Sequence, residues 1–337
     1  MKTTSKTPAL FLGIDVGKTD LFCYLLTNDS TFQKRFDNTP AGIASLIAWL
    51  EKQVAIEGIH TCLEQTGHYG RPVAKALHKA GIGSLYLVNP RQIKAFGNQK
   101  LRRNKSDTAD ARLIAEFVRS EHKELIPWSP QSVDNEQIKE LSRYAEALTN
   151  DTAELKTRCE SVTLPAVLRS LKRRIKAQQN ELADIRKRIN TLIKANHEIK
   201  VQQRLLASIP GIGEITQHIL IAELPEIDHF HSARQLAAWA GLTPRHYISG
   251  TSGRTRTPIT KIGSAALRRA LFMPAMTART NNPLLKTFGD RLRDNGKTPK
   301  QIIIAIMRKL LHQIYGILKS GQPYNPQKRG LNTAAAH

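Results

Sequence analysis

Cysteines and aromatic residues are few in this 337-residue sequence. The three cysteines, Cys23, Cys62 and Cys159, are odd in number and irregularly spaced, which argues against a disulfide framework and against a zinc site. Aromatic residues make up only 6%, so a platform for stacking single-stranded bases is not indicated. No apolar run approaches the ~18 residues of a membrane span, and the N-terminus lacks a signal-peptide cleavage site. We therefore expect no membrane partner and a place in the bacterial cytoplasm, near the nucleoid.

Acidic residues are also scarce, above all in the last third of the chain. The sequence has 51 Lys and Arg against 28 Asp and Glu, a formal net charge of +23. No acid occurs between Asp228 and Asp290, and none follows Asp294. A hydrophobic content of 40% still predicts a folded protein. So large an excess of positive charge favours a polyanionic partner, nucleic acid first and an anionic membrane surface second.

Residues 1–130 alternate between predicted strands and helices and indicate an α/β domain. Three strands are expected first, then a helix, a strand, a helix and a strand, at 9–17, 21–27, 31–38, 40–53, 59–67, 71–81 and 83–89. A basic segment, 91–107, is predicted to be mobile. A helix over 106–120 follows, with Ser106 as its N-cap. RNase H-like nucleases use this same order of elements to place their metal ligands.

The middle of the chain, 131–204, has a heptad pattern that predicts an extended helical hairpin or a coiled coil. Its apolar positions step by four and three, with one polar interruption at Gln178, and Pro165 separates the two helices. Pairing between chains is favoured, because so regular a seam on long helices usually needs a partner, and predicts a homo-oligomer. A helix pair within one chain is the alternative.

The final third is predicted to be mainly helical, with a separate domain over 205–322 and a disordered tail over 323–337. It opens with a helix, "PGIG" and a second helix, the pattern of a helix-hairpin-helix. There Gly211 and Gly213 would let backbone N–H groups approach a phosphate; an ordinary turn between helices is the alternative. A hydroxyl-rich loop, 243–258, contains several arginines and no carboxylate.

Four carboxylates lie where strand ends and a helix face would converge: Asp15, Glu64, Asp107 and Asp110. Asp107 and Asp110 share one face of a helix start, where they could simply complement the helix dipole. An apolar strand has little reason to carry Asp15 or Glu64. Clustered carboxylates repel one another unless a divalent cation neutralises them, so we expect two Mg²⁺ ions, with Mn²⁺ as the alternative.

The segments "GIDVGKTD", "LEQTGHYG" and "NKSDTADARLIAEF" resemble the DEDD motifs of the insertion-sequence family 110 transposases, subgroup 1111. "IPGIGEITQHILIAEL", "WAGLTPRHYISGTSG" and "KIGSAALRRALF" resemble that family's C-terminal domain. The resemblance covers nearly the whole chain. It implies a RuvC-like (RNase H fold) catalytic domain, a coiled coil, and a helix-hairpin-helix domain with the catalytic serine.

The resemblance further implies a recombinase that acts as a dimer or tetramer on donor and target DNA, guided by a structured bridge RNA. It places the metal ligands on the four acids. It also places the nucleophile, which forms a covalent phosphoserine link, on Ser249, with Ser252 as the alternative. The basic residues expected to hold nucleic-acid phosphates are Arg102, Arg103, Lys105, Arg245, Arg254, Arg256 and Lys261.

Two other functions fit parts of the sequence. A RuvC-like Holliday-junction resolvase needs only the four acids and metal, and gives no reason for the hydroxyl-rich loop. A non-enzymatic nucleic-acid-binding protein needs only the basic surface, and predicts that Asp15 can be changed without loss.

Overall fold

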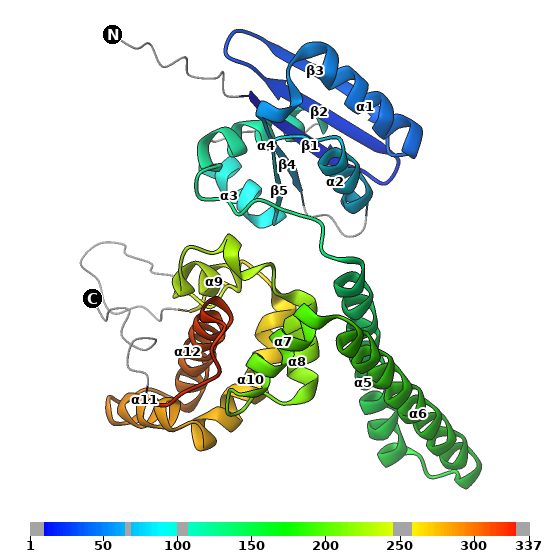
Figure 1. Cartoon of the computed structure of the whole chain (residues 1–337). Coiled ribbons are helices and arrows are strands. Elements are labelled where there is room, and N and C mark those ends of the chain that lie inside the picture. The colour runs from blue at the N-terminus through cyan, green and yellow to red at the C-terminus, as the bar shows by residue number, and fades with distance from the viewer. Residues whose placement is uncertain (1–9, 65–68, 100–106, 245–257, 328–337) are drawn as a thin grey trace. The chain divides into compact units, whose positions relative to one another are not determined.

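The computed structural model describes residues 10–64, 69–99, 107–244 and 258–327. Two compact units divide the chain, Met1–Pro130 and Gln131–His337 (Figure 1). The first unit combines a sheet with helices, and the described part of the second is almost entirely helical. These two classes of structure are the ones that the sequence predicted.

The first unit is built on a mixed five-stranded sheet in the order β3-β2-β1-β4-β5. β1 pairs antiparallel with β2 and parallel with β4, so it is the central strand. The strands are β1 (Leu10–Val16), β2 (Asp20–Leu26), β3 (Thr31–Asp37), β4 (Ile59–Glu64) and β5 (Ser84–Val88). Because helices cover both faces, β1 is apolar on both sides and reads as a nearly continuous hydrophobic run.

Alternate side chains of β1 enter two separate cores. Leu12 and Ile14 pack on the side of α1 (Pro40–Gln53) and α2 (Gly70–Lys79). Phe11 packs on the other side, with α3 (Pro90–Gln99) and α4 (Asp107–Glu121). A short 3₁₀ turn, Ile56–Gly58, leads into β4. The described elements follow the predicted order of strands and helices.

The segment predicted to be mobile is helical over its first part. Pro90 occupies the first position of α3, a place in a helix that proline tolerates. Ile93 is buried in the core against α4, and the Phe96 ring lies 5.5 Å from the ring of Phe117. These apolar contacts fix a stretch whose basic residues suggested a linker. The prediction of mobility is therefore wrong for 91–99, and residues 100–106 lie outside the described part of the chain.

The second unit begins with two long helices, α5 (Val133–Ser161) and α6 (Pro165–Ala195), that pack against each other. Leu148, Leu155 and Ile185 are buried along their seam. The polar interruption at Gln178 accepts a hydrogen bond from Thr152 Oγ1 at 3.1 Å. A helical hairpin within the chain is thus present. Pairing between chains stays a prediction.

The remaining helices surround α12 (Pro299–Ser320). They are α7 (His197–Ala207), α8 (Glu214–Glu223), α9 (Ala233–Trp239), α10 (Ala265–Asn281) and α11 (Pro283–Asp294), with a 3₁₀ turn at Ile227–His229. Contrary to the sequence-based expectation, α12 is long and apolar enough to cross a membrane by length and composition. Half of that stretch is buried, and α12 packs against α7, α9, α10 and α11 as the core helix of this unit.

The start of the predicted disordered tail is anchored. The Tyr324 hydroxyl donates a hydrogen bond to Asn282 Oδ1 at 2.9 Å, and its backbone N–H donates to Ser208 Oγ at 2.8 Å. Asn282 is fully buried between α10 and α11. The prediction of disorder is therefore wrong at Tyr324, and residues 328–337 lie outside the described part.

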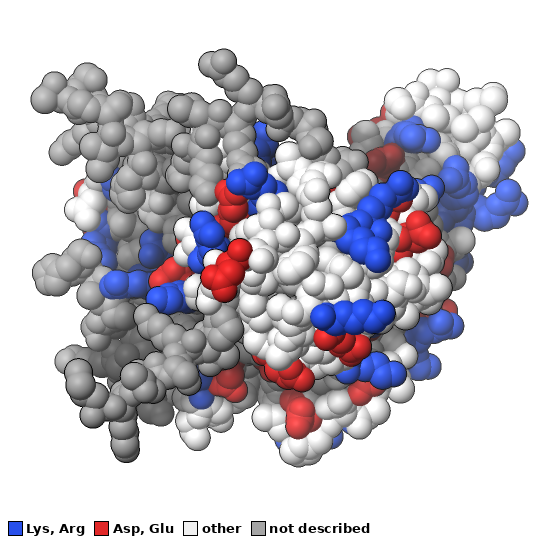
Figure 2. Space-filling view, turned by 90° about the horizontal axis from the view of Figure 1, so that it is seen from above, with Lys and Arg blue, Asp and Glu red and all other residues white. Residues whose placement is uncertain are grey.

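Charge is divided unevenly between the two units. Residues 1–130 contain 18 basic and 12 acidic residues, whereas residues 131–337 contain 33 and 16. On the face shown in Figure 2, basic and acidic side chains alternate around a broad uncharged surface. Most of the excess positive charge therefore belongs to the helical unit.

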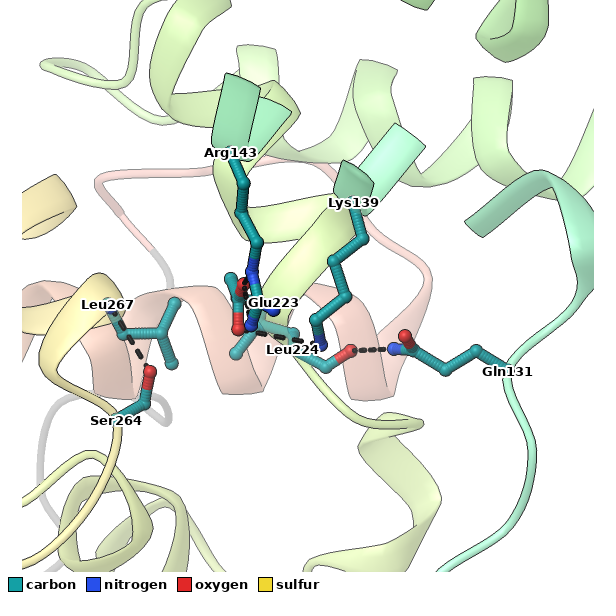
Figure 3. Close-up of polar contacts among 7 residues, drawn as sticks. All are labelled: Gln131, Lys139, Arg143, Glu223, Leu224, Ser264 and Leu267. Atoms are coloured by element: carbon teal, nitrogen blue, oxygen red, sulfur yellow. Dashed lines mark hydrogen bonds and ion pairs between the residues drawn. The ribbon is translucent and has the colours of Figure 1, made fainter. Parts of the chain in front are cut away.

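A small buried ion cluster fixes α5 against α8. Arg143 and Lys139 of α5 both reach Glu223 at the end of α8 (Figure 3). Arg143 Nη2 lies 2.9 Å from Glu223 Oε1, and Lys139 Nζ lies 3.5 Å from Oε2. The Glu223 side chain is only 10% exposed, and these two cations compensate its negative charge. This cluster joins the helical hairpin to the rest of its unit.

Candidate active site

Helix α4 lies directly on the centre of β1, and Gly13 permits this. A Cβ atom at Gly13 would lie 2.2 Å from the backbone oxygen of Ala111 and 2.3 Å from the nitrogen of Ala115. No real side chain could fit in that space, so only glycine allows α4 to approach so closely. The first turn of α4 is thereby held over the sheet beside the C-terminal end of β1.

Three of the four predicted acids come together at this end of the sheet. Asp15 follows Gly13 by two residues, so it lies on the face of β1 that α4 covers. Glu64 ends β4, whose parallel pairing with β1 runs up to Ile14 and Leu63. Asp110 immediately precedes Ala111 in α4. All three acids are half-buried.

The pKa of Glu64 reflects how close these acids lie to one another. Its pKa is raised, first because burial penalises the carboxylate and then because the negative charges of Asp15 and Asp110 oppose its ionisation. Charges act in this way only when they lie near one another. Asp15, Glu64 and Asp110 therefore share one electrostatic site. Asp107 begins α4 in the same turn as Asp110, but its side chain lies outside the described residues.

The chemistry of these residues fits a hard divalent cation. All are carboxylates, the ligands that Mg²⁺ and Mn²⁺ prefer, and a cation would remove the repulsion that raises the pKa of Glu64. Within the described ranges, no group of three histidine, cysteine or acidic side chains is arranged to hold a metal ion. The described acids lie near one another, but their carboxylates are not arranged around a common metal position.

The hydroxyl-rich loop lies mostly outside the described residues, which resume at Pro258. Ser249, Ser252, Arg245, Arg254 and Arg256 fall in the part not described, as do Arg102, Arg103, Lys105 and Ser106 earlier in the chain. Their roles stay predictions.

Backbone contacts join the two segments that flank this loop. Pro244 and Ile259 form an antiparallel bridge, and the N–H of Thr260 donates to the carbonyl of Thr243 at 2.9 Å. Arg268 Nη1 donates a hydrogen bond to the carbonyl of Ala240 at 2.9 Å and so holds the end of α9, which leads into the loop. The two ends of the loop are therefore held side by side.

Lys261, a predicted phosphate-binding residue, follows this base in an unusual conformation. Its φ is +53°, the one positive value among the described non-glycine residues. A left-handed conformation costs a residue with a Cβ about 1–2 kcal/mol, which the surrounding fold must offset. Its exposed side chain carries a positive charge at the foot of the hydroxyl-rich loop. The geometry is compatible with the predicted role and does not test it.

The predicted hairpin between α7 and α8 is present as a turn, with two different glycines. Gly211 has a φ of +101°, and a Cβ there would lie 2.9 Å from the carbonyl oxygen of Pro274 in α10. Packing against α10 thus explains this glycine without a ligand. Gly213 has open space around it and forms the N-cap of α8. Phosphate binding at either glycine stays a prediction.

One positioning residue escaped the sequence-based prediction. Gly13 was treated as part of an apolar strand, although a glycine inside a strand often marks the close approach of another backbone. That signal, two residues before a carboxylate, could have indicated where α4 docks.

Comparisons with known proteins identify the family of this chain. A model of the DEDD transposases, described as "Transposase", matches residues 12–167, and one described as "Transposase IS116/IS110/IS902 family" matches residues 203–290. Pilin gene-inverting proteins of Moraxella lacunata and Moraxella bovis are 32% and 31% identical over 321 residues, covering 94% of this chain and 97% of each relative. A solved T. thermophilus RuvC, in complex with a Holliday junction substrate, aligns with 35% of this chain and 99% of its own at 16% identity. The TM-score of this alignment is 0.26.

Proposed function

Since this chain belongs to the insertion-sequence family 110 of transposases, we propose that it cleaves and rejoins DNA strands by a metal-dependent serine mechanism. Family membership rests on two transposase models and on relatives matched along 97% of their length. The enzyme is a transposase or recombinase in general. The serine chemistry and the guidance by RNA are what we propose.

The observation that carries the proposal is the convergence of Asp15, Glu64 and Asp110 beneath α4. Placing these acids together has an energetic cost at Glu64, because burial and the charges of Asp15 and Asp110 oppose its ionisation. Divalent cations bound at this site would neutralise the carboxylates and could contact the phosphate backbone of DNA.

In this mechanism, Asp15, Glu64, Asp107 and Asp110 hold the divalent cations through their carboxylate oxygens. A bound divalent cation supplies a Lewis acid that polarises the scissile phosphate and lowers the pKa of a nearby hydroxyl. A bound cation would oppose the effects that raise the pKa of Glu64, which are burial first and then the charges of Asp15 and Asp110. The close seating of α4 on Gly13 keeps the acids of the helix in register with those of the strands.

The nucleophile of the proposal is Ser249. Its hydroxyl oxygen bonds to phosphorus, the phosphorus bond to one sugar oxygen breaks, and the hydroxyl proton passes to that leaving oxygen. A sugar hydroxyl from the second DNA strand then bonds to the phosphorus, the bond between phosphorus and the serine oxygen breaks, and the hydroxyl proton returns to the serine oxygen. Arg245, Arg254, Arg256 and Lys261 hold the phosphates next to the reacting one. Ser252 is the alternative nucleophile.

Recognition of DNA sequence in this proposal is left to a structured bridge RNA that pairs with donor and target. The family resemblance suggests it, and the small share of aromatic residues favours recognition of backbone and shape. Oligomers would form through the α5–α6 hairpin and allow one subunit's acids to meet another subunit's serine.

Inversion of a DNA segment is a second candidate outcome of the same chemistry. Both Moraxella relatives are named for inverting a pilin gene, and this chain matches nearly their whole length. Insertion and inversion differ in the arrangement of the recombining sites, while the strand exchange is the same.

The deciding experiment compares the natural protein with Asp15→Asn and Glu64→Gln in a recombination assay with and without Mg²⁺. We expect both variants to bind DNA normally and to lose recombination at least 100-fold. Asp20→Asn, in the same unit, is the matched control, since Asp20 pairs with Arg35 at the start of β2. Full recombination by Asp15→Asn would refute the metal site. Absence of any metal-dependent recombination by the natural protein would favour a non-enzymatic binding protein. Metal-dependent cutting of four-way junctions without rejoining would favour the resolvase.

A further inference from the structure

The half-exposed face of α12 carries cations that meet further cations on the helices beside it. Arg308 and Lys309 lie on this face, near the middle of α12. α12 packs against α9, which carries Arg234, and against α11, which carries Arg291 (Figure 1). We refer to Arg234, Arg308, Lys309 and Arg291 as the cationic row.

Contacts across the helices place these four charges next to one another. Lys309 Nζ lies 5.6 Å, and Arg291 Cζ 5.5 Å, from the centre of the Phe288 ring. This one ring therefore gathers a charge from α12 and a charge from α11.

The pKa values of Lys309 and Arg308 show that neighbouring members of the cationic row affect one another. The pKa of Lys309 is lowered by burial first and then by Arg308 and Arg291. The pKa of Arg308 is lowered by burial first and then by Arg234. Each member thus lies within electrostatic reach of the next.

Acidic partners are missing where the fold could have supplied them. Among the described residues, Arg308, Lys309 and Arg291 form no salt bridge, whereas cations on the same two helices do: Arg293 pairs with Asp290, and Lys319 with Asp228. From residue 229 to the C-terminus the sequence has 18 basic residues and two acidic ones. Arg308 and Lys309 are half-buried neighbours on α12, and their mutual repulsion disfavours the folded protein. A bound polyanion would offset that cost.

A polar atom beside the row also lacks a partner. His312 lies one turn beyond Arg308 on α12, and its Nε2 atom is buried without a hydrogen-bond partner in the described part of the chain. Because this atom is buried, it is not itself a contact point for a ligand.

We propose that the cationic row binds consecutive phosphates of a nucleic-acid backbone, as an anchoring surface separate from the carboxylate site and the hydroxyl-rich loop. This inference rests on the proposed function only in that the chain acts on nucleic acid. The guanidinium groups of Arg234, Arg308 and Arg291 suit two-point contact with phosphate oxygens, and Lys309 adds a point charge. Such contacts hold the backbone without reading its sequence.

The test uses the full-length protein and the double variant Arg308→Gln/Lys309→Gln, which keeps the polar stems and removes two charges. Binding is measured in EDTA, as a function of salt, with a 30-base-pair DNA duplex and an RNA duplex of the same sequence. The matched control is Arg293→Gln/Lys319→Gln, which removes two acid-paired cations from the same two helices.

We expect the double variant to lower the slope of log K against log salt on DNA by about 1.8, and to weaken binding roughly 60-fold at 0.1 M salt. The control should change neither value by more than a small fraction. Loss on DNA alone, on RNA alone or on both supports the row and identifies the strand that it holds. Unchanged slopes on both duplexes would overturn it.

Thermal unfolding separates loss of contact from loss of fold. Removing crowded like charges should leave Tm unchanged or raise it, so weaker binding together with a lower Tm would count against the proposal. Its failure is distinct from failure of the proposed function. The row is tested by binding without metal, whereas the carboxylate site is tested by the recombination of Asp15→Asn.

Discussion

Gly13 in β1 and Ala111 in α4 meet backbone to backbone, with room for a hydrogen atom and none for a methyl group. Their contact holds the strand that carries Asp15 against the helix that carries Asp110. The spacing of the candidate metal ligands therefore depends on a residue that has no side chain.

The first prediction concerns Gly13→Ala. The added methyl group would lie 2.2 Å from the Ala111 oxygen, so α4 must move away from the sheet. We expect a loss of roughly 1–3 kcal/mol in unfolding free energy, as for other overpacked cores, and a loss of recombination larger than stability explains. Gly58→Ala is the control, because the nearest atom to its Cβ would be Leu10 Cδ1 at 3.8 Å. Normal recombination by Gly13→Ala would show that the position of α4 is not critical.

The nucleophile can be identified with two single variants. We expect Ser249→Ala to abolish the covalent protein–DNA adduct and recombination, because no other hydroxyl takes its place, while Ser252→Ala keeps both. The adduct is trapped with a nicked DNA substrate and detected by denaturing electrophoresis and mass spectrometry of the linked peptide. An adduct that persists in Ser249→Ala and disappears in Ser252→Ala would assign the role to Ser252.

A pH-dependent stability is expected from His312. Its pKa is lowered to about 4 by burial first and then by the charges of Arg308, Lys309 and Arg234. Above pH 6.5 the ring is neutral in both folded and unfolded chains and contributes nothing. As the pH falls from 6.5 to 4, the unfolded chain takes up a proton that the folded chain resists, so the unfolding free energy declines.

Chemical denaturation of His312→Gln measures this contribution. Because the ring is partly exposed and screened by solvent, we expect about 1–2 kcal/mol of the decline between pH 6.5 and 4 to disappear in the variant. His229→Gln is the control, because His229 is partly exposed and lies beside Glu226. Parallel pH profiles for the natural protein and His312→Gln would contradict the expectation.

Oligomer formation can be tested on the part of the helical seam that the chain itself leaves open. Ile185 is buried between α5 and α6, so a charge there would disrupt the hairpin and would not report on partners. Leu171 and Ile175 are only half-buried. We expect Leu171→Glu/Ile175→Glu to reduce the oligomer mass in analytical ultracentrifugation, with helix content retained. Lys172→Glu/Lys176→Glu, on exposed positions of the same turns, should leave the mass unchanged.

Much of the first unit could be predicted because its signals are local. Strands such as Leu10–Val16 are continuous apolar runs, and parallel strand ends meet at one edge, so the convergence of Asp15 and Glu64 followed from sequence spacing. The helix Pro90–Gln99 was missed because its basic residues outweighed two apolar anchors, Ile93 and Phe96. Whether those anchors find a core depends on α4, which local sequence does not specify.

The second unit shows where such reasoning stops. Glu223 meets Lys139 and Arg143 across about 80 residues of sequence, and Arg308 meets Arg234 across more than 70. No periodic pattern connects positions so far apart, since their proximity results from how helices pack. Tyr324 shows the same limit, because its tail composition suggests disorder while its hydroxyl reaches a buried asparagine.

The bridge between Pro244 and Ile259 brings the departure and return points of the intervening segment together. A segment whose ends coincide can be exchanged as a cassette, because its replacement imposes no new distance on the helices that hold it. Relatives could therefore vary the hydroxyl-rich segment in length and composition on a constant scaffold. The same junction offers protein engineers a defined pair of splice points.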